Sequence, residues 1–185
     1  MITPIPNNFR GLITISGPTN SGKSKLAEFL IKEHKAITYI ATSKQRPNDS
    51  EWQKRINVHK KRRPLSWKLI EYPADICKAI ESISEEESIL IDSLGGLVEQ
   101  HLMIKDHQWE VLKNEFVNTL IKNNYLIIIV FEEIGWGISP HTQIGHLFRE
   151  RLSNLSSLIS RHSSRRWLAI NGTAIDIDKI GSLIP

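Results

Sequence analysis

The segment from Gly11 to Leu30 constrains this chain most, because an apolar run is followed there by the sequence GPTNSGKS and then by an amphipathic pattern. The central part matches G-x-x-x-x-G-K-[ST], the pattern of a phosphate-binding loop, between a predicted strand and a predicted helix. Glycines let backbone N–H groups surround phosphate oxygens, and the positive N-terminal end of the helix attracts the anion. The candidate nucleotide-binding residues of this loop are Gly17, Pro18, Thr19, Asn20, Ser21, Gly22, Lys23 and Ser24.

The same loop predicts a nucleotide that carries Mg²⁺. In such loops the lysine, here Lys23, neutralises the β and γ phosphates, and the hydroxyl of the next residue, here Ser24, reaches the metal ion. The buried strand 88–92 ends in Asp92, a natural further partner for that ion. The alternative, a helix-capping role for Asp92 ahead of two glycines, stays open at this point. We predict Ser24 and Asp92 as the metal-binding residues.

Strand and helix patterns alternate along the whole chain. Nearly continuous apolar strands such as 125–131 are typical of a parallel sheet covered on both faces, so we predict a three-layer α/β fold with a mostly parallel sheet. Residues 1–10 form an irregular lead-in, and residues 11–185 form a single nucleotide-binding catalytic domain. The expected strands are 11–16, 36–41, 67–72, 88–92, 125–131 and 166–170, with the segment after Gly172 as a candidate hairpin partner. The expected helices are 23–35, 51–61, 73–83, 97–103, 109–122 and 142–162.

Composition places the chain among ordinary globular proteins. It has 185 residues, of which 40% are hydrophobic and 24% are charged. No apolar run approaches the roughly 18 residues of a membrane span, and the N-terminus lacks the basic and apolar regions of a secretory signal, so we expect a cytoplasmic protein. The single cysteine, Cys77, excludes an internal disulfide, and its apolar helical setting predicts a packing role.

The net charge of +4 favours anionic ligands, but it does not choose among them. Basic residues gather at 54–55, at 60–63, and at 161, 165 and 166. These clusters suit a polyphosphate, a nucleic acid or a solvated basic face. They lack the interleaved aromatic residues of a surface that binds single strands, which disfavours nucleic acid.

His59 lies on the predicted inner face of the helix 51–61. Asn48, Asp49 and Ser50 provide capping residues for that helix. At 3.6 residues per turn, His59 shares a stripe with Trp52 and Ile56, so it continues the face that these two residues bury. Spacing alone fits both a half-buried structural histidine and a catalytic one.

Thr42 and Ser43 follow the predicted strand 36–41 directly. The carboxyl ends of parallel strands are the edge at which open α/β sheets bind ligands, and the phosphate loop leaves its own strand at that edge. We therefore expect the two hydroxyl groups to face a ligand, with an ordinary turn as the alternative.

These landmarks together resemble the family of bifunctional adenosylcobinamide kinases and adenosylcobinamide-phosphate guanylyltransferases of cobalamin biosynthesis. Tyr-Ile-Ala-Thr-Ser, R-I-x-x-H-x-x-x-R and E-x-G-x-G-I-x-P in this order are far more selective than a phosphate loop alone. The matching pieces span almost the whole chain and comprise residues 17–24, 39–43, 55–63, 67, 71, 92, 133–140 and 148–149.

The resemblance implies two reactions. ATP or GTP phosphorylates the aminopropanol hydroxyl of adenosylcobinamide, and GMP then passes from GTP to that phosphate through a GMP-histidine intermediate. The matching histidine is His59. A neutral imidazole is a competent nucleophile near neutral pH, and its attack on the α-phosphate would expel pyrophosphate. The resemblance thus implies His59 and Lys23 as catalytic residues, with Arg62 or Arg63 stabilising the charge on the phosphates.

The resemblance also implies the surroundings of the nucleotide, the fold type and the assembly. The fold would be the RecA-like type of P-loop NTPase, the substrate a corrinoid, and the assembly a homotrimer. The further nucleotide-binding positions are Thr42, Ser43, Lys60, Lys61, Arg62, Arg63, Glu71 and Asp92. The chain departs from the family pattern in the phosphate loop and at Ser93, Gly95, Glu132, Gly145, His146, Ser156 and Ser157.

Two other functions fit the residues without the resemblance. One is a small-molecule kinase that uses ATP and in which His59 is only structural. The other is a nucleotide-dependent module whose basic clusters bind nucleic acid, with an affinity that falls steeply with salt.

Overall fold

A seven-stranded sheet with the order β3-β2-β4-β5-β1-β6-β7 runs through the computed structural model, which describes residues 2–137, 139–182 and 184. Every neighbouring pair is parallel except β6 and β7, which form an antiparallel hairpin. The mostly parallel sheet and the hairpin after Gly172 are therefore confirmed. The strands are β1 (Gly11–Ser16), β2 (Ile37–Ala41), β3 (Lys68–Glu71), β4 (Ser88–Asp92), β5 (Leu126–Val130), β6 (Arg165–Ile170) and β7 (Thr173–Asp176).

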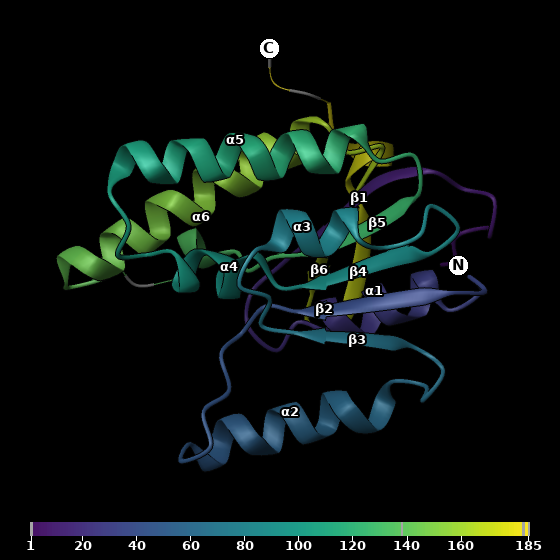
Figure 1. Cartoon of the computed structure of the whole chain (residues 1–185), viewed down its shortest axis with the longest axis horizontal. Coiled ribbons are helices and arrows are strands. Elements are labelled where there is room, and N and C mark those ends of the chain that lie inside the picture. Colours follow the sequence, from purple (N-terminus) through teal and green to yellow (C-terminus); the bar gives the residue numbers. More distant parts are fainter. Residues whose placement is uncertain (1, 138, 183, 185) are drawn as a thin grey trace.

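Helices cover both faces of the sheet, which gives the predicted three layers. One face packs against α1, and the other packs against α3, α4, α5 and α6. Figure 1 shows α5 and α6 above the strands and α2 on the opposite side, below β3. The helices are α1 (Lys23–Ile31), α2 (Ser50–Arg62), α3 (Ile76–Glu81), α4 (Leu94–Gln100), α5 (Asp106–Lys122), α6 (Gln143–Arg161) and α7 (Ile177–Ile180), with a 3-10 turn η1 (Ile134–Trp136).

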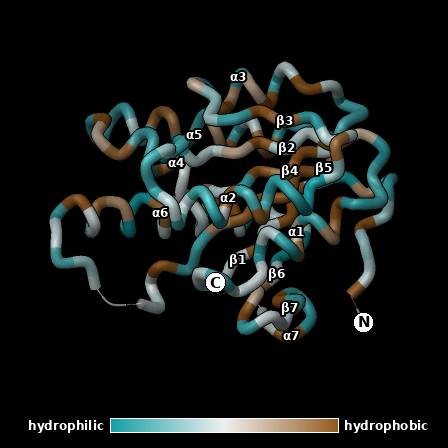
Figure 2. The backbone as a smooth tube through the Cα atoms, turned by 90° about the horizontal axis from the view of Figure 1, so that it is seen from below, coloured by the Kyte–Doolittle hydropathy of each residue, from teal (hydrophilic) through white to brown (hydrophobic). Residues whose placement is uncertain are grey.

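The central strand β5 explains why two apolar layers form. All five of its residues are buried, and neighbouring side chains point to opposite faces. Ile127 and Ile129 pack against the α3–α6 layer, whereas Ile128 and Val130 pack against α1. Figure 2 shows the hydrophobic residues concentrated along β4 and β5. Cys77 is buried in the α3–α6 layer, as predicted.

Several helix boundaries differ from the predicted ones. Helix α1 ends at Ile31 rather than at residue 35, and the turn after it directs His34 to Ser88, with 2.6 Å between Nδ1 and Oγ. Pro73 does not begin α3, because Asp75 caps that helix and accepts a hydrogen bond from the Lys78 backbone at 3.0 Å. The start of α3 is thus set by a capping side chain rather than by hydrophobic periodicity.

The starts of α4 and α5 also differ from the predicted ones. Helix α4 begins three residues earlier than expected and includes both glycines at 95 and 96. At Gly96 a Cβ atom would lie 2.4 Å from Thr42 Oγ1, so the close contact with the segment after β2 requires glycine there. Helix α5 begins at Asp106, where the Gln108 side chain accepts a hydrogen bond from the Lys105 backbone N–H at 3.1 Å.

The register brings the ends of five strands to one edge of the sheet. Ala41 of β2 pairs with Glu71 of β3 and with Asp92 of β4, and Asp92 pairs with Val130 of β5. Val130 in turn pairs with Ile15 of β1, directly before the phosphate loop. The polar residues that follow these strands therefore gather at the carboxyl edge. Within the described residues, no helix has the length and hydropathy needed to cross a membrane.

Candidate active site

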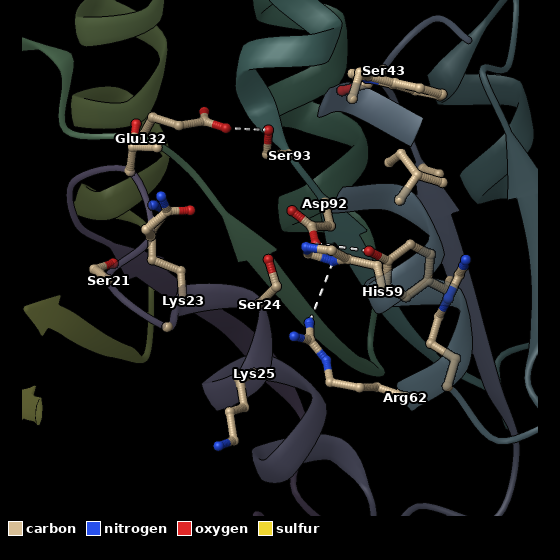
Figure 3. Close-up of a pocket in the computed structure, with 18 of the residues that line it drawn as sticks. Ser21, Lys23, Ser24, Lys25, Ser43, His59, Arg62, Asp92, Ser93 and Glu132 are labelled. Atoms are coloured by element: carbon tan, nitrogen blue, oxygen red, sulfur yellow. Dashed lines mark hydrogen bonds and ion pairs between the residues drawn. The ribbon is translucent and has the colours of Figure 1, made fainter. Parts of the chain in front are cut away.

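A cavity of about 320 Å³ opens at this edge, between the phosphate loop and α2. Figure 3 shows that Lys23 and Ser24 approach it from one side and His59 from the other, with Asp92 between them. The cavity thus joins segments that are far apart in the sequence. The predicted site residues that line it are Thr19, Asn20, Ser21, Gly22, Lys23, Ser24, Ser43, His59, Arg62, Arg63, Glu71 and Asp92.

Five predicted site residues lie outside the cavity lining. Gly17 and Pro18 form the base of the phosphate loop, and the Pro18 carbonyl accepts a hydrogen bond from Lys23 Nζ at 2.7 Å. Thr42 is buried and turned toward the backbone of Ser93 rather than toward the cavity. The remaining two, Lys60 and Lys61, are exposed residues near the end of α2.

The phosphate loop has the backbone geometry that its glycines predict. Gly17 has a φ of +150°, and a Cβ atom there would lie 2.1 Å from the Ala169 carbonyl oxygen. Gly22 has a φ of +100° and directly precedes α1. The N-terminal end of α1 therefore points its positive dipole at the cavity, next to the Lys23 ammonium group.

Helix α2 carries His59 to the cavity on the face that the sequence predicts. Asp49 caps the helix and accepts a hydrogen bond from the Trp52 backbone at 2.9 Å. Trp52 and Ile56 line the cavity together with His59, whose Nδ1 lies 3.8 Å from Asp92 Oδ2 and 3.4 Å from Arg62 Nη2. The imidazole therefore lies between a carboxylate and a guanidinium group.

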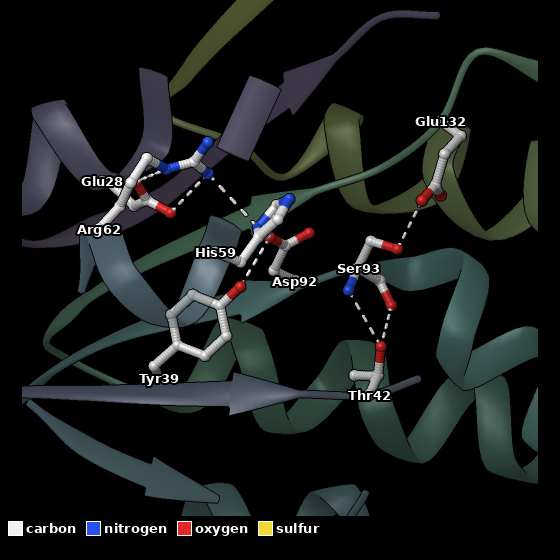
Figure 4. A network of polar contacts seen from close by, with 8 residues as sticks. All are labelled: Glu28, Tyr39, Thr42, His59, Arg62, Asp92, Ser93 and Glu132. Atoms are coloured by element: carbon white, nitrogen blue, oxygen red, sulfur yellow. Dashed lines mark hydrogen bonds and ion pairs between the residues drawn. The ribbon is translucent and has the colours of Figure 1, made fainter. Parts of the chain in front are cut away.

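Asp92 is the centre of the polar contacts in the site (Figure 4). Tyr39 donates its hydroxyl hydrogen to Asp92 Oδ2 at 2.7 Å, and the Arg63 guanidinium stacks on the Tyr39 ring, 4.2 Å from the ring centre. Burial, and then the nearby carboxylate, raise the pKa of Tyr39 well above its usual value, so it remains a donor. Ser93, not Asp92, occupies the capping position of α4, so the capping alternative for Asp92 is wrong.

Two ion pairs connect α2 to the body of the protein. Arg62 makes two hydrogen bonds of 3.0 Å to the carboxylate of Glu28 on α1. Lys60 Nζ lies 3.6 Å from Glu71 Oε1 at the end of β3. The basic cluster at 60–63 is thus used partly to hold α2 and partly, through Arg62 and Arg63, to line the cavity.

Oxygen ligands for a divalent cation are present where the sequence predicts them. The Ser24 hydroxyl and the Asp92 carboxylate line the same cavity. No group of three or more His, Cys, Asp or Glu in metal-binding geometry occurs among the described residues. That arrangement fits Mg²⁺, which usually takes one or two protein oxygens and completes its shell with water and substrate phosphates.

Sequence reasoning assigned no role to several side chains that line the cavity. Trp52 and Ile56 were predicted as inward-facing, and Tyr39 belongs to a matched motif, but none was expected to contact a ligand. Ser93 and Glu132 also line the cavity. The sequence signal that could have identified them is their position directly after the strands β4 and β5. The departures at His146, Ser156 and Ser157 lie elsewhere on α6, where the two serines line a separate cavity.

Residues 13–177 match the family model described as cobinamide kinase / cobinamide phosphate guanyltransferase, or CobU. The bifunctional adenosylcobalamin biosynthesis protein CobU of Escherichia coli K12 is 26% identical over 181 residues, which cover 90% of this chain and 99% of that protein. The bifunctional protein CobP of Pseudomonas aeruginosa is 29% identical over 161 residues, which cover 85% and 92%. The resemblance thus extends over nearly the full length of both relatives.

Solved structures share the fold at low sequence identity. A protein of Pyrococcus horikoshii OT3 aligns with a TM-score of 0.55 and 8% identity, covering 96% of this chain and 93% of that one. An ATPase of a bacterial type III secretion system aligns with a TM-score of 0.51 and 8% identity, covering 94% and 59%. These likenesses concern the fold alone.

Proposed function

The chain belongs to the cobinamide kinase / cobinamide phosphate guanylyltransferase family, and we propose that Lys23 and His59 carry its two reactions in one shared cavity. It is accordingly a bifunctional enzyme of adenosylcobalamin biosynthesis that phosphorylates adenosylcobinamide and then joins a guanylyl group to the product. The observation that supports the shared site is that the phosphate loop and His59 open onto the same cavity, on either side of Asp92.

In the kinase reaction, the phosphate loop holds the triphosphate of ATP or GTP. Backbone N–H groups at the start of α1 and the Lys23 ammonium group bind the β and γ phosphates. Lys23 Nζ, which contacts the Pro18 carbonyl 2.7 Å away, exchanges this neutral acceptor for phosphate oxygens. The γ-phosphate then lies at the carboxyl edge of the sheet, where a hydroxyl group of the corrinoid can attack it.

In the guanylyl transfer, His59 is the nucleophile. A nitrogen of its neutral imidazole attacks the α-phosphorus of GTP, the bond to the bridging oxygen breaks, and pyrophosphate leaves with the electron pair. The phosphate of adenosylcobinamide phosphate then attacks the same phosphorus and releases the imidazole. Asp92, 3.8 Å from Nδ1, orients the ring, while Arg62 and Arg63 stabilise negative charge on the phosphates.

Ser24 and Asp92 are the residues that would hold Mg²⁺ in this site. An ion held there would supply positive charge that stabilises the negative charge developing on the phosphate oxygens. The other contacts of Asp92 fit this role, because Tyr39 donates to Oδ2 and so keeps the carboxylate turned toward the cavity.

The test uses GTP labelled at the α-phosphate. We expect wild-type protein to retain the label in an acid-labile, base-stable adduct, and the His59→Ala variant to retain none while still phosphorylating cobinamide. Replacement of His162, an exposed histidine after α6, by Ala is the matched control and should leave labelling unchanged. Folded wild-type protein that takes up no label would contradict the role of His59. A His59→Ala variant that is labelled normally would contradict it equally.

The predicted assembly and partners complete the proposal. The expected partners are the corrinoid and nucleoside triphosphates, and nucleic acid is not expected to bind. A homotrimer is the expected assembly, and sedimentation of the protein in solution measures it. A monomer or dimer at micromolar concentration would contradict that expectation.

A further inference from the structure

Three carboxylates line the described part of the active-site cavity, and their partners differ. Glu71 lies 3.6 Å from Lys60 Nζ and 3.4 Å from Gln45 Nε2. Asp92 accepts a hydrogen bond from Tyr39 and lies beside His59. Glu132 accepts one hydrogen bond, from Ser93 Oγ to Oε1 at 2.6 Å, whereas its Oε2 is buried without a partner. Of these three carboxylates, Glu132 is the one that has a buried oxygen without a hydrogen-bond partner.

The backbone holds Glu132 next to the phosphate loop. The residue before it, Phe131, donates its N–H to the Ile15 carbonyl, and the residue after it, Glu133, donates to the Gly17 carbonyl, both at 3.0 Å. Figure 3 shows the Glu132 side chain between the phosphate loop and Ser93, on the Lys23 side of the cavity and away from His59. This is the side on which the proposed kinase step places the γ-phosphate.

The fold makes room for this carboxylate. A Cβ atom on Gly95 would lie 2.6 Å from Glu132 Oε2, so a larger residue at position 95 would displace it. Ser93 in turn is fixed through its backbone N–H, which donates to Thr42 Oγ1 at 3.0 Å (Figure 4). A buried carboxylate oxygen that accepts no hydrogen bond lowers the stability of the folded protein. A hydrogen-bond donor on a bound substrate would remove this penalty.

We infer that Glu132 is the general base of the kinase step, an assignment that rests on the proposed function of the cavity. The hydroxyl oxygen of the corrinoid forms a bond to the γ-phosphorus, and its proton passes to the Glu132 carboxylate. The bond from the γ-phosphorus to the bridging oxygen breaks, and the nucleoside diphosphate leaves with the electron pair. Ser93 is a positioning residue that holds the carboxylate in this orientation.

The test separates the two activities in a Glu132→Gln variant. Glutamine keeps the size of the side chain and can still accept from Ser93, but it takes up no proton. We expect phosphorylation of cobinamide by ATP to fall about 100- to 10,000-fold, the range typical of a lost general base, and the rate to lose its acidic limb in a pH profile. Labelling of the protein by α-labelled GTP should stay at the wild-type level.

A second variant and a control complete the experiment. Glu132→Ala should be inactive as a kinase and should recover activity when formate is added, because formate supplies the missing carboxylate. Glu133→Gln is the matched control, since the Glu133 side chain lines the separate cavity beside α6. A Glu132→Gln variant with wild-type kinase activity, or with kinase and labelling reduced equally, overturns the inference. Wild-type protein that shows neither activity refutes the proposed function instead.

Discussion

The phosphate loop and helix α2 face each other across one cavity, yet different kinds of contact hold them in place. The loop is fixed by backbone hydrogen bonds, from Glu133 to Gly17 at 3.0 Å and from Gly172 to Ser21 at 3.2 Å. Helix α2 buries Trp52, but it is joined to α1 and β3 by ion pairs at the ends of long, partly exposed side chains. Exposed ion pairs are weak and are screened by salt.

This difference assigns different tasks to the two regions. A site that binds phosphate through backbone N–H groups depends on fixed geometry, so its residues are replaceable only where the backbone permits. A nucleophile on a helix held by charged side chains depends on those charges for its position. Single substitutions in the loop should therefore lower mainly the stability of the fold. Single substitutions in the contacts of α2 should lower mainly the rate of guanylyl transfer.

The largest effect on stability is expected for Gly17→Ala. Its Cβ atom would lie 2.1 Å from the Ala169 carbonyl oxygen, at a φ of +150° that disfavours other residues, so the loop or β6 must move. We expect the free energy of unfolding to fall by about 3 kcal/mol and nucleotide binding to be lost. Urea unfolding and nucleotide titration measure both.

Gly135→Ala is the matched control for that substitution. A Cβ atom there meets no atom within 4 Å, and its φ is not in the left-handed region. Its effect on stability should stay within about 0.5 kcal/mol. Equal effects of the two substitutions would contradict the view that backbone geometry fixes the loop.

A smaller effect on stability, but a clear effect on chemistry, is expected for Glu28→Gln. The change removes the charged partner of Arg62, whose Nη2 lies 3.4 Å from His59 Nδ1. We expect the rate of guanylylation to fall about tenfold, equivalent to about 1.4 kcal/mol, with less than about 1 kcal/mol lost from stability. Phosphorylation of cobinamide should be unchanged.

The control for Glu28 is another carboxylate paired with a cation of α2. Glu51 pairs with Lys54 at 2.9 Å, and both side chains are largely exposed to solvent. Glu51→Gln should therefore alter neither rate. A guanylylation rate that is the same in the Glu28→Gln variant and the wild type would show that α2 is held by other contacts.

The smallest expected effect is a loss of stability at acidic pH. We expect this loss to arise from the sheet and the turn after α1 rather than from α2. Burial lowers the pKa of His34 from its ordinary value of 6.5, so the unfolded chain binds a proton that the folded chain excludes. The stability that results is present above pH 6.5 and is lost as the pH falls from there through the folded pKa. Urea unfolding across this range should show decreasing stability.

His34→Gln tests the origin of that decrease. Glutamine does not titrate, so the variant should lose stability less steeply with falling pH than the wild type. Some dependence of stability on pH should persist in the variant, because burial also lowers the pKa of His101. Replacement of exposed His162 by Gln controls for the loss of a histidine as such, and an unchanged slope in the His34 variant would contradict this origin.

Much of the fold could be predicted from local sequence patterns, because the spacing of hydrophobic residues and the composition extend over the full length of each helix or strand. The apolar run at 125–131 became the buried strand β5, and the phosphate-loop pattern appeared between β1 and α1 as expected. Helix starts were less predictable. Asp75 caps the start of α3 with its side chain, and Ser93 occupies the N-cap position of α4, and hydrophobic periodicity indicates neither.

The site was predictable where one segment carried several clues. The stripe of Trp52, Ile56 and His59 was inferred from helical spacing alone, and all three residues line the cavity. The contact between Ser93 and Glu132 could not be inferred in this way, because the two residues follow different strands and meet only through the order of β4 and β5 in the sheet. Their separate departures from the family pattern gave no sign that they touch.

The central claim is that His59 becomes covalently bonded to GMP. Protein incubated with GTP, digested under basic conditions and analysed by mass spectrometry measures this directly. We predict a guanosine monophosphate group on the peptide that contains His59 and on no other peptide. The same group on a lysine such as Lys23, or on another histidine, would contradict the account.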